Sequence, residues 1–144
     1  MESDFMKFIK ECSENILFKE VCPISTIMEK RYEGQELVIR FFAYLNNYKN
    51  FKHSVVDFMD DYTTKVKDNF SRKDMLNEFE RMLKFVKKYF PYGFAKSKEA
   101  KSTPRVRFEA ISVGVGLALR EKPSLQVEEI NWVDSEEFLK HTTT

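Results

Sequence analysis

Basic and aromatic side chains alternate in residues 84–107, and this composition could support contact with DNA. Cations neutralise the phosphates of a nucleic acid, and aromatic rings stack on its bases. The alternative interpretation is a solvated, lysine-rich helix end followed by a loop. The candidate contacts are Lys84, Lys87, Lys88, Lys96, Lys98, Lys101, Arg105 and Arg107, with Glu99 as the single acid and Tyr89, Phe90, Tyr92 and Phe94 interleaved.

Two oppositely charged residues, Arg40 and Glu109, each occur beside an apolar helical stripe. An unpaired charge inside a core costs several kcal/mol, so a buried arginine needs a carboxylate partner. We predict a structural ion pair between Arg40 and either Glu109 or Glu36. A ligand contact by Arg40, or extension of its guanidinium to water, are the alternatives.

The remaining residues with chemical potential do not form a recognisable site. The two histidines, His53 and His141, have no cysteine or histidine at ligand spacing, and Cys12 and Cys22 are too few for a zinc site or a disulfide framework. The sequence contains no phosphate-binding glycine loop and no nucleophile elbow. We therefore predict no metal, no cofactor and no catalytic residue, and we interpret Cys12 as a reduced core thiol.

Composition indicates a single soluble domain over residues 1–144. The 24 basic residues balance 23 acidic ones, so net charge favours neither nucleic acid nor a membrane surface. Fourteen Phe with only four Gly and four Pro are typical of helices rather than of a turn-rich β-sandwich. The first residues lack the apolar stretch of a signal peptide, and no run is long enough to span a membrane, so we expect a cytoplasmic protein.

Apolar residues recur at steps of three and four along most of the chain, which predicts an all-α fold. We expect an irregular bundle of about six helices, with Gly114 and Gly116 at a close contact between helices. Residues 91–104 are polar and small, and we predict a mobile loop there. The predicted helices are 3–21, 33–48, one that opens at Ser54, one that opens at Ser71 and closes at Pro91, 104–120, and a short helix within 135–140, with Leu125, Val127, Ile130 and Trp132 buried.

Three segments together resemble one family of prokaryotic defence proteins. They are residues 31–42 with the run Glu-Leu-Val-Ile-Arg-Phe-Phe, residues 48–59 with spaced Tyr, Phe and Met, and Phe108-Glu109-Ala110 followed by a Val-Gly-rich run. The resemblance covers about residues 24–120. It is to the C-terminal helical region of proteins that begin with a ParB-like domain, such as GmrSD-type modification-dependent restriction enzymes.

The resemblance implies a part of a larger protein rather than an enzyme. The family's Asp-Gly-Gln-Gln-Arg motif and its nuclease module do not occur in this sequence. We therefore expect a non-catalytic accessory domain, a fragment whose partner is the ParB-like domain of an NTP-dependent DNA endonuclease. Self-association through uncovered apolar residues is a further expectation. The alternatives are a free-standing DNA-binding module that uses residues 84–107, and a small enzyme with a site that motifs do not show.

Overall fold

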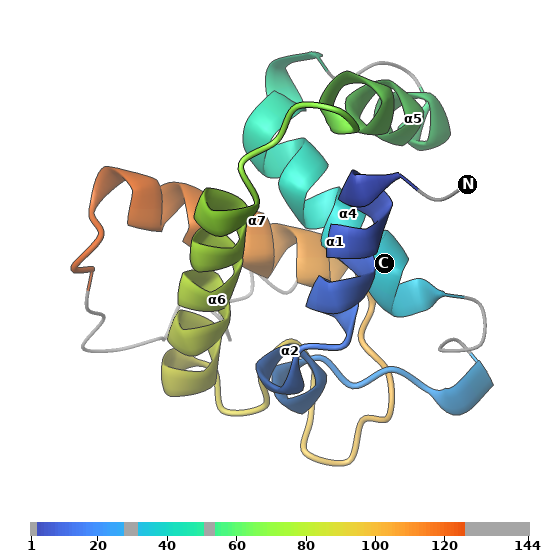
Figure 1. The fold of residues 1–144 in the computed structure, drawn as a ribbon. Coiled ribbons are helices and arrows are strands. Elements are labelled where there is room, and N and C mark those ends of the chain that lie inside the picture. Colours follow the sequence, from blue (N-terminus) through green and yellow to red (C-terminus); the bar gives the residue numbers. More distant parts are fainter. Residues whose placement is uncertain (1–2, 28–31, 51–53, 126–144) are drawn as a thin grey trace.

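The fold is built from helices throughout the part of the chain that the structure describes, and the predicted all-α class is confirmed. The computed structural model describes residues 3–27, 32–50 and 54–125, and no strand occurs among them. Figure 1 shows an irregular bundle in which α6 and α7 cross beside α4. The elements are α1 (Asp4–Ser13), α2 (Ile16–Val21), α4 (Glu33–Asn47), the 3₁₀ turn η1 (Tyr48–Asn50), α5 (Val55–Val66), α6 (Arg72–Tyr89) and α7 (Arg105–Glu121).

The predicted first helix, 3–21, is wrong, because the structure divides it into α1 and α2. Asn15 caps α2, and its side-chain oxygen accepts hydrogen bonds from the backbone N–H groups of Leu17 and Phe18. Asparagine competes with the helical backbone in this way, which stops α1 and starts a new helix at a different angle. As a result Ile16, which continuous helical spacing from Phe5, Phe8, Ile9 and Cys12 would place on the buried side, is 83% exposed, and Phe18 enters the core.

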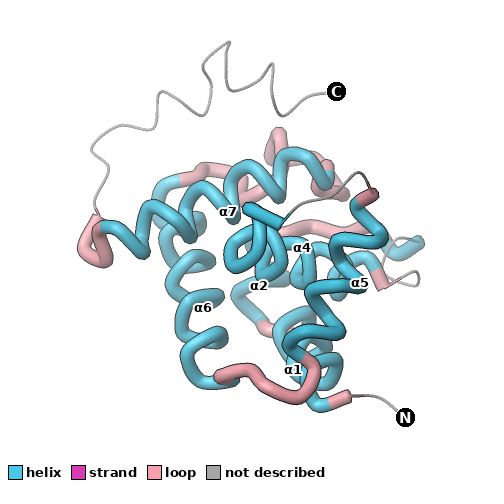
Figure 2. The backbone as a smooth tube through the Cα atoms, turned by 90° about the horizontal axis from the view of Figure 1, so that it is seen from above, coloured by secondary structure: helices cyan, strands magenta, loops and turns pink. Residues whose placement is uncertain are grey.

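The predicted start points of the next helices are correct. The Ser54 hydroxyl accepts a hydrogen bond from the Asp57 N–H at 3.3 Å, which is the capping geometry expected at the start of α5. At the start of α6, the Ser71 hydroxyl instead donates to the Asp74 carboxylate at 2.9 Å. Figure 2 shows α5 and α6 as separate helices joined by a short loop.

The two glycines of α7 have different environments. A Cβ atom on Gly116 would lie 2.9 Å from Leu45 Cδ1 and 3.2 Å from Phe41 Cε1, so glycine permits the close crossing of α7 over α4. A Cβ atom on Gly114 would meet nothing within 4 Å in the described structure. The predicted close contact is therefore present at Gly116 and absent at Gly114.

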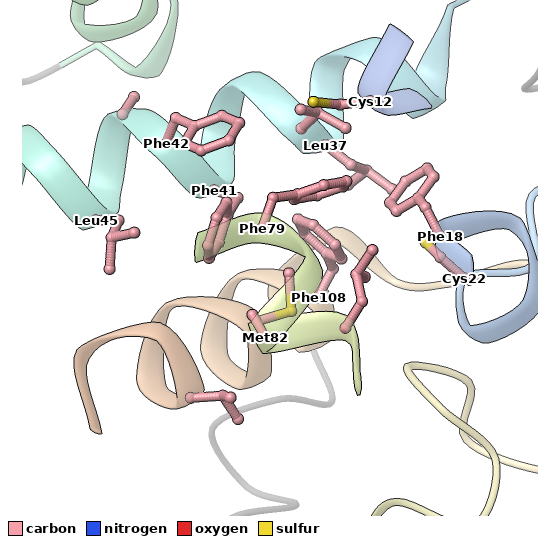
Figure 3. Packing of buried hydrophobic residues seen from close by; sticks show 14 of the residues in the cluster. Cys12, Phe18, Cys22, Leu37, Phe41, Phe42, Leu45, Phe79, Met82 and Phe108 are labelled. Carbon is pink, nitrogen blue, oxygen red and sulfur yellow. The ribbon is translucent and has the colours of Figure 1, made fainter. Parts of the chain in front are cut away.

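Phenylalanine rings form the centre of the core. Phe79 of α6 is fully buried, and its ring centroid lies 5.7 Å from that of Phe18 and 5.9 Å from those of Phe41 and Phe42. Figure 3 shows these rings converging from α2, α4 and α6, with Phe108 of α7 beside them. Aromatic pairs at such distances add stabilisation beyond their buried area.

The connector between α6 and α7, residues 91–104, is attached to α2. The Phe94 N–H donates to the Val21 carbonyl at 2.8 Å, and the Thr103 hydroxyl donates to the Pro23 carbonyl at 2.9 Å. Phe94 itself is fully buried and lies 4.8 Å from the ring of Phe108. These contacts hold both ends of the connector to the bundle, and the mobility of its middle stays a prediction.

The end of the chain is described only as far as Leu125, which is partly buried and packs against the core. The predictions of buried Val127, Ile130 and Trp132 and of a helix within 135–140 lie outside the described residues.

Candidate functional site

The charged residues singled out on α4 and α7 meet in the structure. Arg40 Nη1 donates to Glu109 Oε1 at 2.5 Å, and the two side chains are 13% and 23% exposed. Glu36, the other partner considered, is exposed. Burial and the Glu109 carboxylate raise the pKa of the neighbouring Tyr44, while the Arg40 guanidinium lowers it. The pair therefore braces α4 against α7 within a partly desolvated setting.

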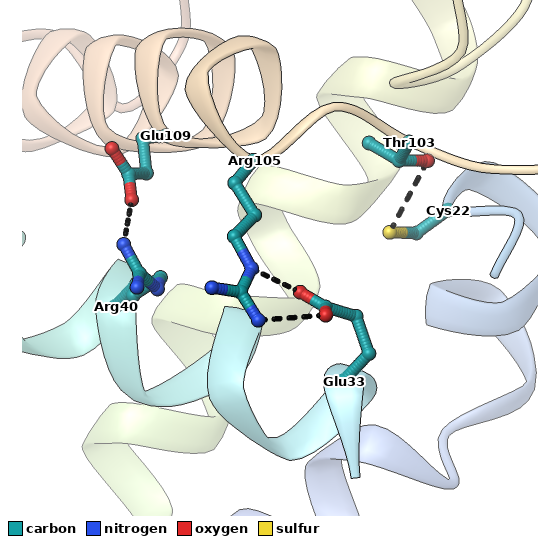
Figure 4. A network of polar contacts seen from close by, with 6 residues as sticks. All are labelled: Cys22, Glu33, Arg40, Thr103, Arg105 and Glu109. Atoms are coloured by element: carbon teal, nitrogen blue, oxygen red, sulfur yellow. Dashed lines mark hydrogen bonds and ion pairs between the residues drawn. The ribbon is translucent and has the colours of Figure 1, made fainter. Parts of the chain in front are cut away.

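A second ion pair joins the same two helices and was not predicted. Arg105 forms a two-pronged contact with Glu33, in which Nε lies 2.6 Å from Oε1 and Nη2 lies 2.8 Å from Oε2 (Figure 4). Glu33 is only 4% exposed, and its hydrogen bonds raise the pKa of Arg105. Such forked contacts are the stronger arginine–carboxylate geometry.

A third pair connects α7 to α6 near the other end of the helix. Arg120 Nε and Nη2 contact the two oxygens of Glu78 at 2.7 and 2.8 Å, and Nη1 donates to the Leu45 carbonyl at 3.3 Å. The contact with Glu78 raises the pKa of Arg120. Three arginine–carboxylate pairs therefore fix α7 along its length.

The structure removes Arg107 from the predicted nucleic-acid contacts. Its side chain is only 5% exposed, and Nε donates to the Phe94 carbonyl at 3.0 Å inside the bundle. In the sequence, Arg107 belongs to a run of basic residues, which does not show that its side chain is buried. In the structure, Arg107 and Phe108 both face the connector and contact Phe94. The guanidinium of Arg105, another predicted contact, is paired within the protein through its two hydrogen bonds to Glu33.

Six of the eight predicted basic residues are exposed lysines. Lys87 forms a surface ion pair with Glu20 at 2.9 Å, in which both side chains are more than half exposed. The other five occupy the last turns of α6 and the connector. They are Lys84, Lys88, Lys96, Lys98 and Lys101.

A hollow of about 460 Å³ lies where the end of α2, the end of α6 and the connector meet. Lys87 and Lys98 both line it, which brings a helix cation and a connector cation to one depression. Tyr92, 49% exposed, and Glu20 line it as well. An aromatic ring beside two cations could accept a planar anionic group, although Glu20 offsets part of that charge.

Both cysteines are buried thiols without a disulfide. Burial raises the pKa of Cys12 and of Cys22 to about 12, with the Thr103 hydroxyl opposing the effect at Cys22. Cys22 Sγ lies 3.7 Å from Thr103 Oγ1, beneath the connector (Figure 4). Because the thiolate is the reactive form, these residues are packing elements at neutral pH.

Two other results bear on possible chemistry. Within 3–27, 32–50 and 54–125, no group of three His, Cys, Asp or Glu side chains is arranged to hold a metal ion. His53 and His141 lie outside those ranges. None of the described helices has the length and apolar character needed to cross a bilayer.

Comparison with known proteins identifies no relative: no family model matches the sequence, and neither the curated proteins nor the solved structures provide a match.

Proposed function

We propose that this chain is a non-catalytic helical accessory domain of a cytoplasmic anti-phage restriction protein, and that it braces a ParB-like domain. The supporting observation is the contact between two of the segments that carry the family resemblance. Arg40, in the Glu-Leu-Val-Ile-Arg run of α4, pairs with Glu109, in the Phe-Glu-Ala run of α7. Because these two motif residues join α4 to α7, their role is structural, as expected of a domain that supports another domain.

The structural details of α7 favour the same role. Arg105, Glu109 and Arg120 each tie this helix to α4 or α6 through an ion pair. The close crossing at Gly116 adds a rigid apolar contact. A helix fixed at several points along its length can transmit the position of one domain to another without local deformation.

The proposal is tested by mixing the chain with a ParB-like domain that bears the Asp-Gly-Gln-Gln-Arg motif. We expect a stable complex in sedimentation velocity, and a change in the NTP hydrolysis rate of the ParB-like domain when the chain is added. We expect no hydrolysis by the chain alone. Absence of a complex, or turnover of nucleotide by the chain alone, would show that the proposal is wrong.

The second candidate function is DNA binding through the six exposed lysines of α6 and the connector. The observation that favours it is the meeting of Lys87 and Lys98 at one hollow beside Tyr92. Backbone phosphates would be neutralised by cations from both elements, and the exposed ring could stack on an unpaired base.

DNA binding by this surface predicts a steep dependence on salt. Lys87 is paired with Glu20, so the five other lysines are the expected phosphate contacts. If these five contact the phosphates of a duplex DNA probe, log K should fall with log salt concentration at a slope of about −4.5. Replacing Lys84, Lys88, Lys96, Lys98 and Lys101 by alanine should abolish binding in a fluorescence-anisotropy titration. The matched control replaces five exposed lysines elsewhere, namely Lys10, Lys49, Lys65, Lys67 and Lys73. Equal losses in both variants would indicate only a general effect of net charge.

A further inference from the structure

One side of α7 is apolar and only partly covered by the described elements, because Val113 and Leu117 pack at the edge of the core while their neighbours on that side are open. α7 packs against α4 and α6, and Figure 2 shows it at one edge of the bundle. On its other side Ala110 and Gly114 are exposed, Val106 is 39% exposed, and Val113 and Leu117 are partly buried. These five residues recur at steps of three and four and therefore share a side, which we call the outer face of α7.

The outer face differs from the solvent side of an ordinary surface helix. Such a helix carries charged and polar residues opposite its buried stripe, whereas a helix that is apolar all round is normally buried. No charged residue occurs between Glu109 and Arg120. The other helices conform to the usual pattern, as in α6, whose exposed side carries Lys73, Lys84 and Lys88. The outer face of α7 therefore has the composition of a covered surface.

We propose that residues 126–144 of this chain cover the outer face of α7. The chain turns immediately after the helix, where the Leu125 N–H donates to the Lys122 carbonyl at 3.0 Å, and Leu125 packs against the core. α7 is about 25 Å long, and the segment after Leu125 can extend about 60 Å. Covalent attachment also gives the segment a high effective concentration at the face.

The sequence of the segment complements both the face and the rest of the chain. Its apolar residues are Val127, Ile130, Trp132, Val133, Phe138 and Leu139. It contains five acidic residues and one lysine, a net charge of −4, so the remainder of the chain carries +5 within the total of +1. Opposite charges favour association of the segment with the body of the protein rather than with another acidic segment.

Trp132 is the only tryptophan in the chain, so its fluorescence reports on this segment alone. In the full-length protein we expect emission at a shorter wavelength than in the same protein unfolded in guanidinium. Replacing Ala110→Glu places a charge at the centre of the outer face, on an already exposed residue. We expect this variant to keep its helical circular dichroism while Trp132 emission shifts to the red and acrylamide quenching increases.

The matched control is Val56→Glu, which adds the same charge at a site on α5 that is 68% exposed. It should leave Trp132 emission unchanged. The proposal is overturned if native Trp132 emits like the unfolded chain, or if Ala110→Glu leaves the emission unaltered. It is also overturned if the native emission moves to the red on dilution in step with dissociation of a dimer, because a second copy would then cover the face. None of these outcomes depends on the family resemblance.

Discussion

Replacing Gly93→Ala is expected to destabilise the fold by about 3–5 kcal/mol, from left-handed strain and overpacking. Gly93 has φ of +60°, and a Cβ atom there would lie 2.3 Å from the Val21 carbonyl oxygen. The connector would have to move away from α2. It would then lose the hydrogen bond from Phe94 to Val21 and withdraw the Phe94 ring from the core. Urea unfolding monitored by circular dichroism measures the change.

The control for this prediction is Gly114→Ala. Gly114 lies in the middle of α7, and a Cβ atom there would meet no described atom within 4 Å, so alanine should stabilise the protein by about 0.5–1 kcal/mol through its higher helix propensity. The two variants make the same chemical change in opposite structural contexts. Equal changes in the free energy of unfolding for the two variants would show that Gly93 does not pack closely against α2.

The second large effect is expected for Phe79→Ala, which should cost about 3–5 kcal/mol. Phe79 is fully buried and contacts rings from α2 and α4, so its removal opens a cavity where three helices meet. The cavity cannot close without moving all three helices. Thermal unfolding by calorimetry should show a lower midpoint and a lower unfolding enthalpy.

Two companions calibrate this result. Phe79→Leu retains most of the buried volume and should cost much less than the alanine variant. Tyr48→Ala removes a ring of similar size that is 49% exposed, and it should change stability little. A Phe79→Ala loss no larger than that of Tyr48→Ala would argue against a core centred on Phe79.

The periodic apolar pattern predicted the all-α class because the buried face of a helix is marked by apolar residues only three and four positions apart. Ser54 and Ser71 could be read as helix starts because capping depends on residues only three positions apart. The division at Asn15 was also a local feature. The division was not predicted because apolar residues at helical spacing continue past Asn15. In the structure, a second buried stripe begins after Asn15 with Phe18.

The charged contacts were less predictable because they depend on how helices cross. The Arg40–Glu109 contact could be inferred, since each residue lies beside an apolar stripe and needs a partner. Arg105 and Glu33 gave no such indication, because Arg105 belongs to a basic run and Glu33 to the first turn of a helix. Their pairing joins residues 72 positions apart. Only the crossing of α4 and α7 brings them together.

The attachment of the connector to α2 has a consequence for the order in which the protein folds during synthesis. The Val21 carbonyl receives its hydrogen bond from Phe94, and Phe18 packs edge-on against Phe108. Chains leave the ribosome from the N-terminus at about 5–20 residues per second. α1 and α2 therefore emerge from the ribosome several seconds before the connector and α7, which pack on α2 in the folded protein, have been synthesised. During that interval their phenylalanines form a surface that chaperones can recognise, and native docking of α2 awaits translation of α7.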